Sequence, residues 1–430
     1  MRKIILFLLS LSTCFTACHK DDDPSPSEQS TTRTVMVYMA AENNLTNSNN
    51  YKYLQADLQE IIKGSNQLTD DQRLLVFVDS LNSNNKYTGM PCILEVHGGE
   101  VNKLYEFDHE FYSSDPVYFK QILQWMVANA PAQSYGLVLW GHASGWFFDT
   151  NGFAPVAASR PRKAYGLDYG SDDRDGSGEK WMNIPQMAEA LADVPKLEFI
   201  FADCCNMMCA EVGYELRNAT NYLIGSPAEI PGEGAPYDKI VPVLYKQGSD
   251  LYRSIIDTYY DEYKSSYNYI SYLKGYSVPL SVIDTKHIEA LAYKTHDILE
   301  QLTDTYPTYP AAPNVDQDSI AFYMYSDAPI MYDMRAFVKT YAPADVFEQW
   351  DLVYQKAVPY YRMSMKWMTI SISMEYAFNR FCHDETQNGC VSMFIPRNLS
   401  SYYNSTPKYN TTYKLLGWNQ VIDWSRFGWN

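Results

Sequence analysis

The chain has 430 residues, of which 46% are hydrophobic and 20% are charged, a composition typical of a globular protein with a large core. It carries 34 lysine and arginine residues against 51 aspartate and glutamate residues, a formal net charge of −17. Because nucleic-acid binding needs clustered positive charge, this balance argues against a nucleic-acid partner. It suits attraction of basic peptides, although a solvated acidic surface is the simpler explanation.

The N-terminus has the pattern of a targeting segment. Arg2 and Lys3 precede the apolar run 4–11, which is long enough for a signal-peptide core and too short for a spanning helix. The residues up to Cys18 read FTAC and resemble the lipobox of bacterial lipoproteins, in which the cysteine is lipidated. We therefore predict a signal peptide over 1–17 and a lipid on Cys18; the alternative is a plain secretory signal with an incidental cysteine.

Residues 18–32 are polar and rich in Asp, Ser and Pro, which predicts a disordered tether behind the lipid. The run KDDD at 20–23 resembles the surface-export signal of lipoproteins from Bacteroidetes-type bacteria. The expected location is the outer membrane, with the protein surface-exposed or facing the periplasm and held to the membrane through the lipid. We expect a monomer.

Apolar runs alternate with helical patterns through the first half of the folded chain, which indicates an α/β protein with a mostly parallel sheet. The expected strands are 34–40, 74–78, 136–140, 197–202 and 222–225, the expected helices are 51–62, 115–130 and 184–191, and 91–107 is expected to form a hairpin. We predict a catalytic core over 33–250. The part from 251 to 430 is rich in helix and tyrosine, and its strands at 280–283 and 391–395 would complete the sheet.

Periodicity disappears between residues 147 and 182, which predicts a long surface loop. The segment from Asp173 to Glu179 resembles a calcium-binding loop in composition, but the spacing of its residues does not match the EF-hand pattern. We predict a solvated acidic turn there and no cofactor or metal, with calcium left open.

One stretch, Lys196 to Arg217, carries the reactive candidates. A short apolar strand ends at Asp203, Cys204 and Cys205, and the following residues have helical spacing, so the thiols are expected at a helix N-terminus that favours a thiolate. A second strand ends at Gly141 and His142, which offers a base across the sheet. A metal site at Cys204, Cys205 and Cys209 is the weaker alternative, because adjacent cysteines have poor tetrahedral geometry.

Taken alone, each candidate has an ordinary structural explanation. His142 could be a histidine held in a turn, Cys205 a buried small apolar side chain, and Asp203 the cap of the following helix. The surrounding motifs favour the catalytic interpretation of these residues. TVMVYMAAENNL at 34–45, LVLWGHASGW at 137–146, DCCNMMCAEVGYEL at 203–216, PGEGAPYDKI at 231–240 and VSMFIP at 391–396 resemble, in order, the motifs of the clostripain-type cysteine peptidases of the caspase-like group.

This resemblance implies a caspase-like α/β/α sandwich and peptide-bond cleavage through a thioester. It also chooses between the adjacent thiols, since Met207 and Glu211 place the nucleophile at Cys205. His142 is then the general base, with no required third residue. The backbone N–H groups of Ala143 and Cys205 would hold the oxyanion, and Asp203 would line a pocket for Arg or Lys.

The chain departs from the family pattern at several positions. Gly141 replaces an Asp and Ala143 a Gly, and the pocket loop has Pro227 and Ala235 where acidic or amide residues and Trp are usual. An inactive surface binding protein with this fold is therefore the alternative function. Family members often cut themselves in the loop between the two motifs, and the basic candidates here are Arg160, Arg162, Lys163, Arg174 and Lys180.

Overall fold

The structure is a computed structural model that describes residues 31–46, 51–81, 90–148, 164–170, 178–269, 271, 274–305, 320–326, 328–368, 387–396 and 406–424. The predicted signal peptide, Cys18 and nearly all of the predicted tether lie outside these residues, so the lipid anchor stays a prediction. Within the described part, no helix has the length and apolar character needed to cross a membrane.

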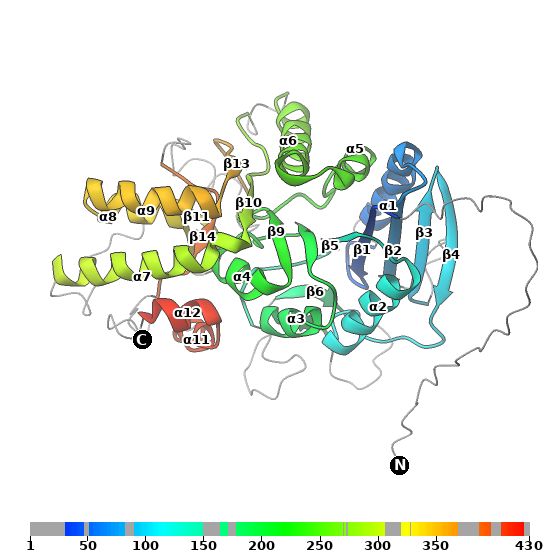
Figure 1. The fold of residues 1–430 in the computed structure, drawn as a ribbon, viewed down its shortest axis with the longest axis horizontal. Helices are drawn as coiled ribbons and strands as arrows, with labels where there is room; N and C mark the ends of the chain where they lie inside the picture. The colour runs from blue at the N-terminus through cyan, green and yellow to red at the C-terminus, as the bar shows by residue number, and fades with distance from the viewer. Residues whose placement is uncertain are drawn as a thin grey trace, which may run out of the picture.

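A nine-stranded sheet forms the centre of the molecule (Figure 1). Its five middle strands are parallel, in the order β9 (Thr220–Gly225), β8 (Leu197–Asp203), β5 (Ser134–Trp140), β1 (Arg33–Ala41) and β2 (Gln72–Ser80). The antiparallel strands β3 (Cys92–His97) and β4 (Glu100–Glu106) extend one edge, and β10 (Leu280–Asp284) and β13 (Tyr360–Arg362) extend the other. The predicted strands and the hairpin over 91–107 are confirmed.

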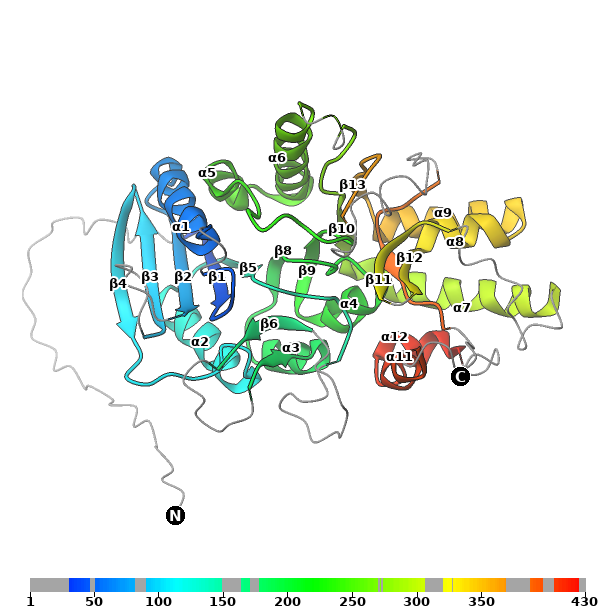
Figure 2. The same ribbon diagram turned by 180° about the vertical axis from the view of Figure 1, so that it is seen from behind.

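Helices cover both faces of this sheet (Figures 1 and 2). One face carries α1 (Tyr53–Gly64), α5 (Tyr237–Ile240) and α6 (Gly248–Tyr267), and the other carries α2 (Pro116–Asn129), α3 (Ile184–Leu191) and α4 (Ala210–Glu215). Residues of β1 alternate between the two cores: Val37 packs on the α1 side, whereas Tyr38 packs on the α2 side. A strand that is buried on both faces consists of a continuous run of apolar residues, which is why the sequence alone predicted it. The predicted α/β/α sandwich is confirmed.

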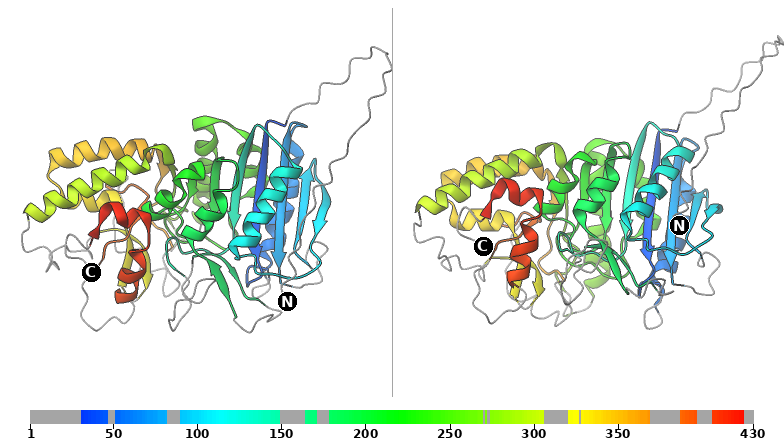
Figure 3. Two further views of the ribbon diagram at one scale, coloured as in Figure 1. Left: turned by 60° about the horizontal axis from the view of Figure 1, so that its bottom comes forward. Right: turned by 90° about the horizontal axis from the view of Figure 1, so that it is seen from below.

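The C-terminal part extends the molecule beyond one end of the sheet (Figure 3). It contains α7 (Ile288–Thr305), α8 (Met334–Tyr341), α9 (Ala344–Ala357), α11 (Thr406–Tyr413), α12 (Gly417–Ile422) and a small sheet of β11 (Phe322–Ser326), β12 (Ala328–Asp333) and β14 (Ser392–Met393). The predicted strand at 391–395 is thus β14, and it belongs to the small sheet. The predicted boundary after residue 250 lies inside α6, while β10 and β13 join the main sheet from the C-terminal side.

The expectation of an unstructured loop over 147–182 is wrong in part. β6 (Tyr165–Asp168) and β7 (Lys180–Met182) form an antiparallel hairpin within it. β6 is held against the segment that follows β5, because the Ser144 N–H donates to Ala164 O and the Gly166 N–H donates to His142 O, both at 2.9 Å. These long-range backbone bonds leave no trace in local periodicity.

Candidate active site

The two candidate reactive residues follow neighbouring parallel strands at the same level. Trp140 at the end of β5 pairs with Asp203 at the end of β8. His142 lies two residues beyond Trp140, and Cys205 lies two residues beyond Asp203. The register therefore brings both residues to one edge of the sheet, where ligands of open α/β sheets bind.

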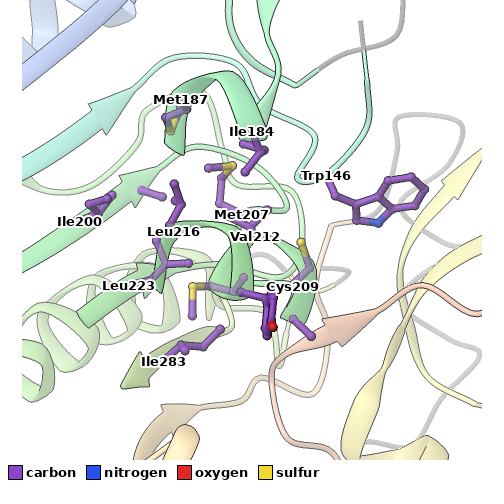
Figure 4. Packing of buried hydrophobic residues seen from close by; sticks show 14 of the residues in the cluster. Trp146, Ile184, Met187, Ile200, Met207, Cys209, Val212, Leu216, Leu223 and Ile283 are labelled. Atoms are coloured by element: carbon purple, nitrogen blue, oxygen red, sulfur yellow. The ribbon is translucent and has the colours of Figure 1, made fainter. Parts of the chain in front are cut away.

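The loops that carry them are packed against each other. Gly145 has a φ of +63°, and a Cβ at this position would lie 2.6 Å from the Asn206 carbonyl oxygen and 3.3 Å from the Cys209 sulfur. Such an approach excludes any side chain. Figure 4 shows the buried cluster to which Trp146, Met207 and Cys209 all belong.

A tight turn presents the Cys205 thiol. Asn206 has a φ of 60°, its backbone N–H donates to Ala228 O at 3.0 Å, and its side-chain Nδ2 donates to Pro227 O at 2.9 Å. Cys205 is half-buried, and its sulfur accepts a hydrogen bond from the Ile230 N–H at 3.4 Å. The residues 226–230 therefore fix both the turn and the thiol.

The neighbouring thiol is in a different environment. Cys204 is fully buried in the core on the α2 side, and burial raises its pKa well above the usual range. Both cysteines are free thiols. Burial makes Cys204 a packing residue of the core, whereas Cys205 is partly exposed.

The prediction that a helix begins at the cysteines is wrong. α4 begins only at Ala210, and the chain before it is bonded to neighbouring segments, with the Met208 N–H donating to Ser226 O and the Ser392 N–H donating to Met208 O, both at 3.0 Å. Met207 and Met208 imitate helical spacing because both are fully buried. The Cys205 thiol therefore receives the N–H of Ile230 and no N–H from a helix N-terminus.

His142 is oriented by a residue that the sequence did not single out. Its Nε2 lies 2.8 Å from Oδ1 of Asn44, in the loop that follows β1. Because this oxygen accepts, Nε2 carries the proton and Nδ1 is the basic nitrogen of the neutral ring. Asn44 lies inside the AENNL motif, but its partner is 98 residues away in the chain, so spacing gave no signal.

The geometry of residues 141–143 also explains two departures from the family pattern. Gly141 has a φ of +137°, and a Cβ there would lie 2.9 Å from the Ala40 carbonyl oxygen, so an Asp would be strained and crowded. Ala143 forms an antiparallel bridge with Tyr165 in which the flanking residues make the hydrogen bonds, so its own N–H points away from β6. The extra methyl of Ala143 is buried.

Asp203 lies on the α1 side of the sheet and is 3% exposed. One oxygen, Oδ2, accepts from the Ala235 N–H at 3.0 Å and the Tyr237 hydroxyl at 2.8 Å; the other accepts from the Tyr259 hydroxyl at 3.0 Å. Burial raises its pKa, and these three hydrogen bonds oppose the rise. The carboxylate is thus solvated by the protein itself.

A second buried carboxyl group, which the sequence did not reveal, lies beside Asp203. Asp57 of α1 is 2% exposed and accepts from Trp140 Nε1 at 2.6 Å. Burial and then the charge of Asp203 raise its pKa well above the usual range. Among the described residues, no lysine or arginine pairs with either group. The two carboxyl groups lie together beneath Gly234, where a Cβ would be 2.8 Å from Asp203 Oδ2 and 3.4 Å from Asp57 Oδ2.

The comparisons with known proteins agree with this geometry. The model of the clostripain family matches residues 37–429. Among solved structures, a secreted C11 cysteine protease from Bacteroides thetaiotaomicron in complex with an irreversible peptide inhibitor is 28% identical with a TM-score of 0.69, covering 92% of this chain and 99% of that one. An inactive zymogen C11 protease from Parabacteroides distasonis is 23% identical with a TM-score of 0.68, covering 91% and 98%, and shows the shared fold. No curated protein matched the chain.

Proposed function

Because this chain belongs to the clostripain family of cysteine peptidases, we propose that it is an endopeptidase that cuts after Arg or Lys, with Cys205 as nucleophile and His142 as general base. The observation that carries the assignment of these residues is the pairing of Trp140 with Asp203 in neighbouring strands, together with the close approach of Gly145 to Asn206. Both put the histidine loop and the cysteine loop at one edge of the sheet.

The chemistry follows from the orientation of His142. Nδ1 takes the thiol proton as the sulfur of Cys205 attacks the substrate carbonyl carbon, and the N–H groups of Ala143 and Cys205 hold the oxyanion. The C–N bond breaks as the imidazolium gives its proton to the leaving amine. Water, deprotonated by the same imidazole, then hydrolyses the thioester. Asn44 is a positioning residue, since it holds the ring in one tautomer through Nε2.

The preference for a basic side chain is supported by the negative charge around the thiol. Asp203 and Asp57 lie together beneath Gly234, and Glu229 precedes Ile230, whose N–H donates to the Cys205 sulfur. Glu233 is exposed on the loop 231–236, which covers Asp203. A guanidinium or ammonium group entering beneath this loop would meet charge that no described basic residue neutralises.

Self-processing in the segment 147–182 is the second part of the proposal. Lys180 is a poor candidate for the cut, since it lies in β7, is 8% exposed and has its Nζ 4.3 Å from the centre of the Tyr112 ring. Proteolysis needs an accessible, extended segment. The remaining candidates, Arg160, Arg162, Lys163 and Arg174, lie outside the described residues.

The adjacent cysteines provide a matched test. Cys205→Ala should lower kcat/KM on Arg and Lys peptide substrates by about 10³-fold or more, because the nucleophile is lost. Cys204→Ala, which removes an equally sized group from the core next to it, should retain most of the activity. Wild type and Cys205→Ala that cleave equally, or that both fail on every peptide tested, would contradict the assignment and favour the inactive binding protein.

The same two variants test self-processing on a denaturing gel. The wild type and Cys204→Ala should show two fragments that meet within 147–182, whereas Cys205→Ala should remain a single band. Sequencing the new N-terminus would identify the cut. A single band for an active wild type would contradict self-processing and leave the peptidase assignment intact.

A further inference from the structure

Tyr169 contacts the residue that orients the general base. Its hydroxyl donates to Oδ1 of Asn44 at 3.3 Å, and the same oxygen lies 2.8 Å from Nε2 of His142, from which it accepts. The three side chains therefore form a network in which one amide oxygen accepts from the other two. The proposed chemistry uses His142 and Asn44 and gives Tyr169 no role.

Asn44 gains from a second partner because it lies at the surface. It is exposed, whereas the neighbouring Asn43 is fully buried. Water competes for the hydrogen bonds of an exposed amide, and a side chain that is held by a single bond moves between several rotamers. A second donor to Oδ1 restricts this movement and keeps the amide oxygen beside Nε2 of the imidazole.

The backbone around Tyr169 is fixed to the loop that carries Asn44. The Tyr169 N–H donates to Glu42 O at 2.9 Å, and Nδ2 of Asn43 donates to Leu167 O at 2.8 Å. These bonds set the position of the phenol relative to Asn44 before any substrate binds. A supporting residue that is held by the fold in this way can restrain the residue in front of it.

The strand that precedes Tyr169 also holds the backbone of the base. Tyr169 directly follows β6, and the Gly166 N–H of this strand donates to His142 O at 2.9 Å. His142 is thus held through its backbone by β6 and at its ring by Asn44, which Tyr169 contacts. Because β6 lies within 147–182, the segment proposed for self-processing also supports the base.

We propose that Tyr169 is a positioning residue for the peptidase reaction and acts by holding Asn44 against His142. The inference rests on the proposed function, in which His142 is the general base. The amide oxygen of Asn44 only accepts, so a ring held against it carries its proton on Nε2 and receives the thiol proton at Nδ1. Without the Tyr169 hydroxyl, the amide and the ring leave this arrangement in a fraction of the molecules, and that fraction does not react.

A double-mutant cycle tests the network. Tyr169→Phe should lower kcat on Arg and Lys peptide substrates by about 5-fold and leave KM unchanged, because the lost hydrogen bond lies away from the substrate. Asn44→Ala should lower kcat more, and adding Tyr169→Phe to it should have no further effect. The matched control is Tyr112→Phe, which removes a hydroxyl that donates to Gly178 O at 3.1 Å in the same segment and should keep full activity.

A second measurement needs no peptide substrate. Iodoacetamide alkylates the Cys205 thiolate, and mass spectrometry of the modified protein gives the rate at this residue. At pH 7 the rate for Tyr169→Phe should be about 5-fold below that of the wild type, because a displaced imidazole promotes less thiolate. Above about pH 9.5 the two rates should converge, since the thiol ionises there without a base. A general loss of structure would not produce this convergence.

Equal kcat values and equal alkylation rates for the wild type and Tyr169→Phe would overturn the proposal. Fully additive losses in the double variant would also overturn it, since Tyr169 would then act independently of Asn44. If the wild type cleaves no peptide, the proposed function fails, and the alkylation rates still decide whether Tyr169 acts on the base. Tyr169 is 37% exposed, so its replacement by Phe leaves the core intact. If Asn44→Ala does not fold, Asn44→Ser, which also removes the amide oxygen, replaces it in the cycle.

Discussion

Asp203 and Asp79 are both buried near the carboxyl ends of parallel strands of one sheet, yet their hydrogen bonding differs. Both lie at or near the carboxyl end of a parallel strand and are nearly inaccessible to solvent. Asp203 accepts three hydrogen bonds from Ala235, Tyr237 and Tyr259, whereas Asp79 accepts none from the described residues. Burial at a strand end therefore does not by itself determine how the chain satisfies a carboxylate.

The largest expected effect concerns Asp203 and catalysis. Asp203→Asn should lower kcat/KM on Arg substrates by about 10³-fold, because a buried charge pair with the substrate, worth roughly 4 kcal/mol, is lost. Substrates with a neutral side chain before the cut should be affected far less. The control is Asp79→Asn, which should keep the Arg preference. If Asp203→Asn also keeps it, the pocket assignment is wrong.

A third buried carboxyl group lies between these extremes. Oε1 of Glu211 accepts from the Phe394 N–H at 2.7 Å and from the Tyr413 hydroxyl at 3.1 Å, and burial raises its pKa from 4.5 to about 7. The folded protein thus binds this proton more tightly than the unfolded chain does. The stability that the protonated carboxyl provides is fully present below about pH 4.5 and is lost as the pH rises through about 7.

Glu211→Gln mimics the protonated group at every pH. The difference in unfolding free energy between this variant and the wild type should grow in favour of the variant by about 3 kcal/mol between pH 4 and pH 9. Urea denaturation at a series of pH values measures it. A difference that does not depend on pH would show that Glu211 is ionised in the folded protein.

The smallest expected effect is a difference in sign between the effects of replacing the two aspartates. Asp203→Asn should lower the free energy of unfolding by about 2 kcal/mol, because an amide NH₂ then faces hydroxyl and N–H donors. Asp79→Asn should raise it, since it removes a repulsive charge. Urea denaturation measures both effects. Destabilisation of both variants to the same extent would contradict the contrast.

The sequence was sufficient to predict the sheet and its reactive edge. β5 and β8 are continuous apolar runs, and His142 and Cys205 follow them directly. The predicted helix at the cysteines failed, because burial of Met207 and Met208 by distant segments has the same spacing as a helical face. The local sequence pattern indicates which residues are buried, but it does not indicate which segments of the chain bury them.

The residues that support the site were harder to find. Asn44 orients a ring on another strand, and Asp57 reaches Trp140 across 83 positions of the chain. The cluster of Glu42, Asp79 and Asp168 comes from three separate elements. Groups assembled by strand order have no fixed spacing, so they become visible only when the fold is known.

The strand order has a consequence for the molecule after self-processing. Any cut between β5 and β8 divides the main sheet cleanly, with β4, β3, β2, β1 and β5 in one polypeptide and β8, β9, β10 and β13 in the other. The interface between the two products would be the hydrogen-bonded pairing of β5 with β8, and both faces of this pair are buried in hydrophobic cores to which both products contribute. The nicked enzyme would therefore behave as an obligate heterodimer whose halves separate only on denaturation, and Cys205 and His142 would belong to different chains.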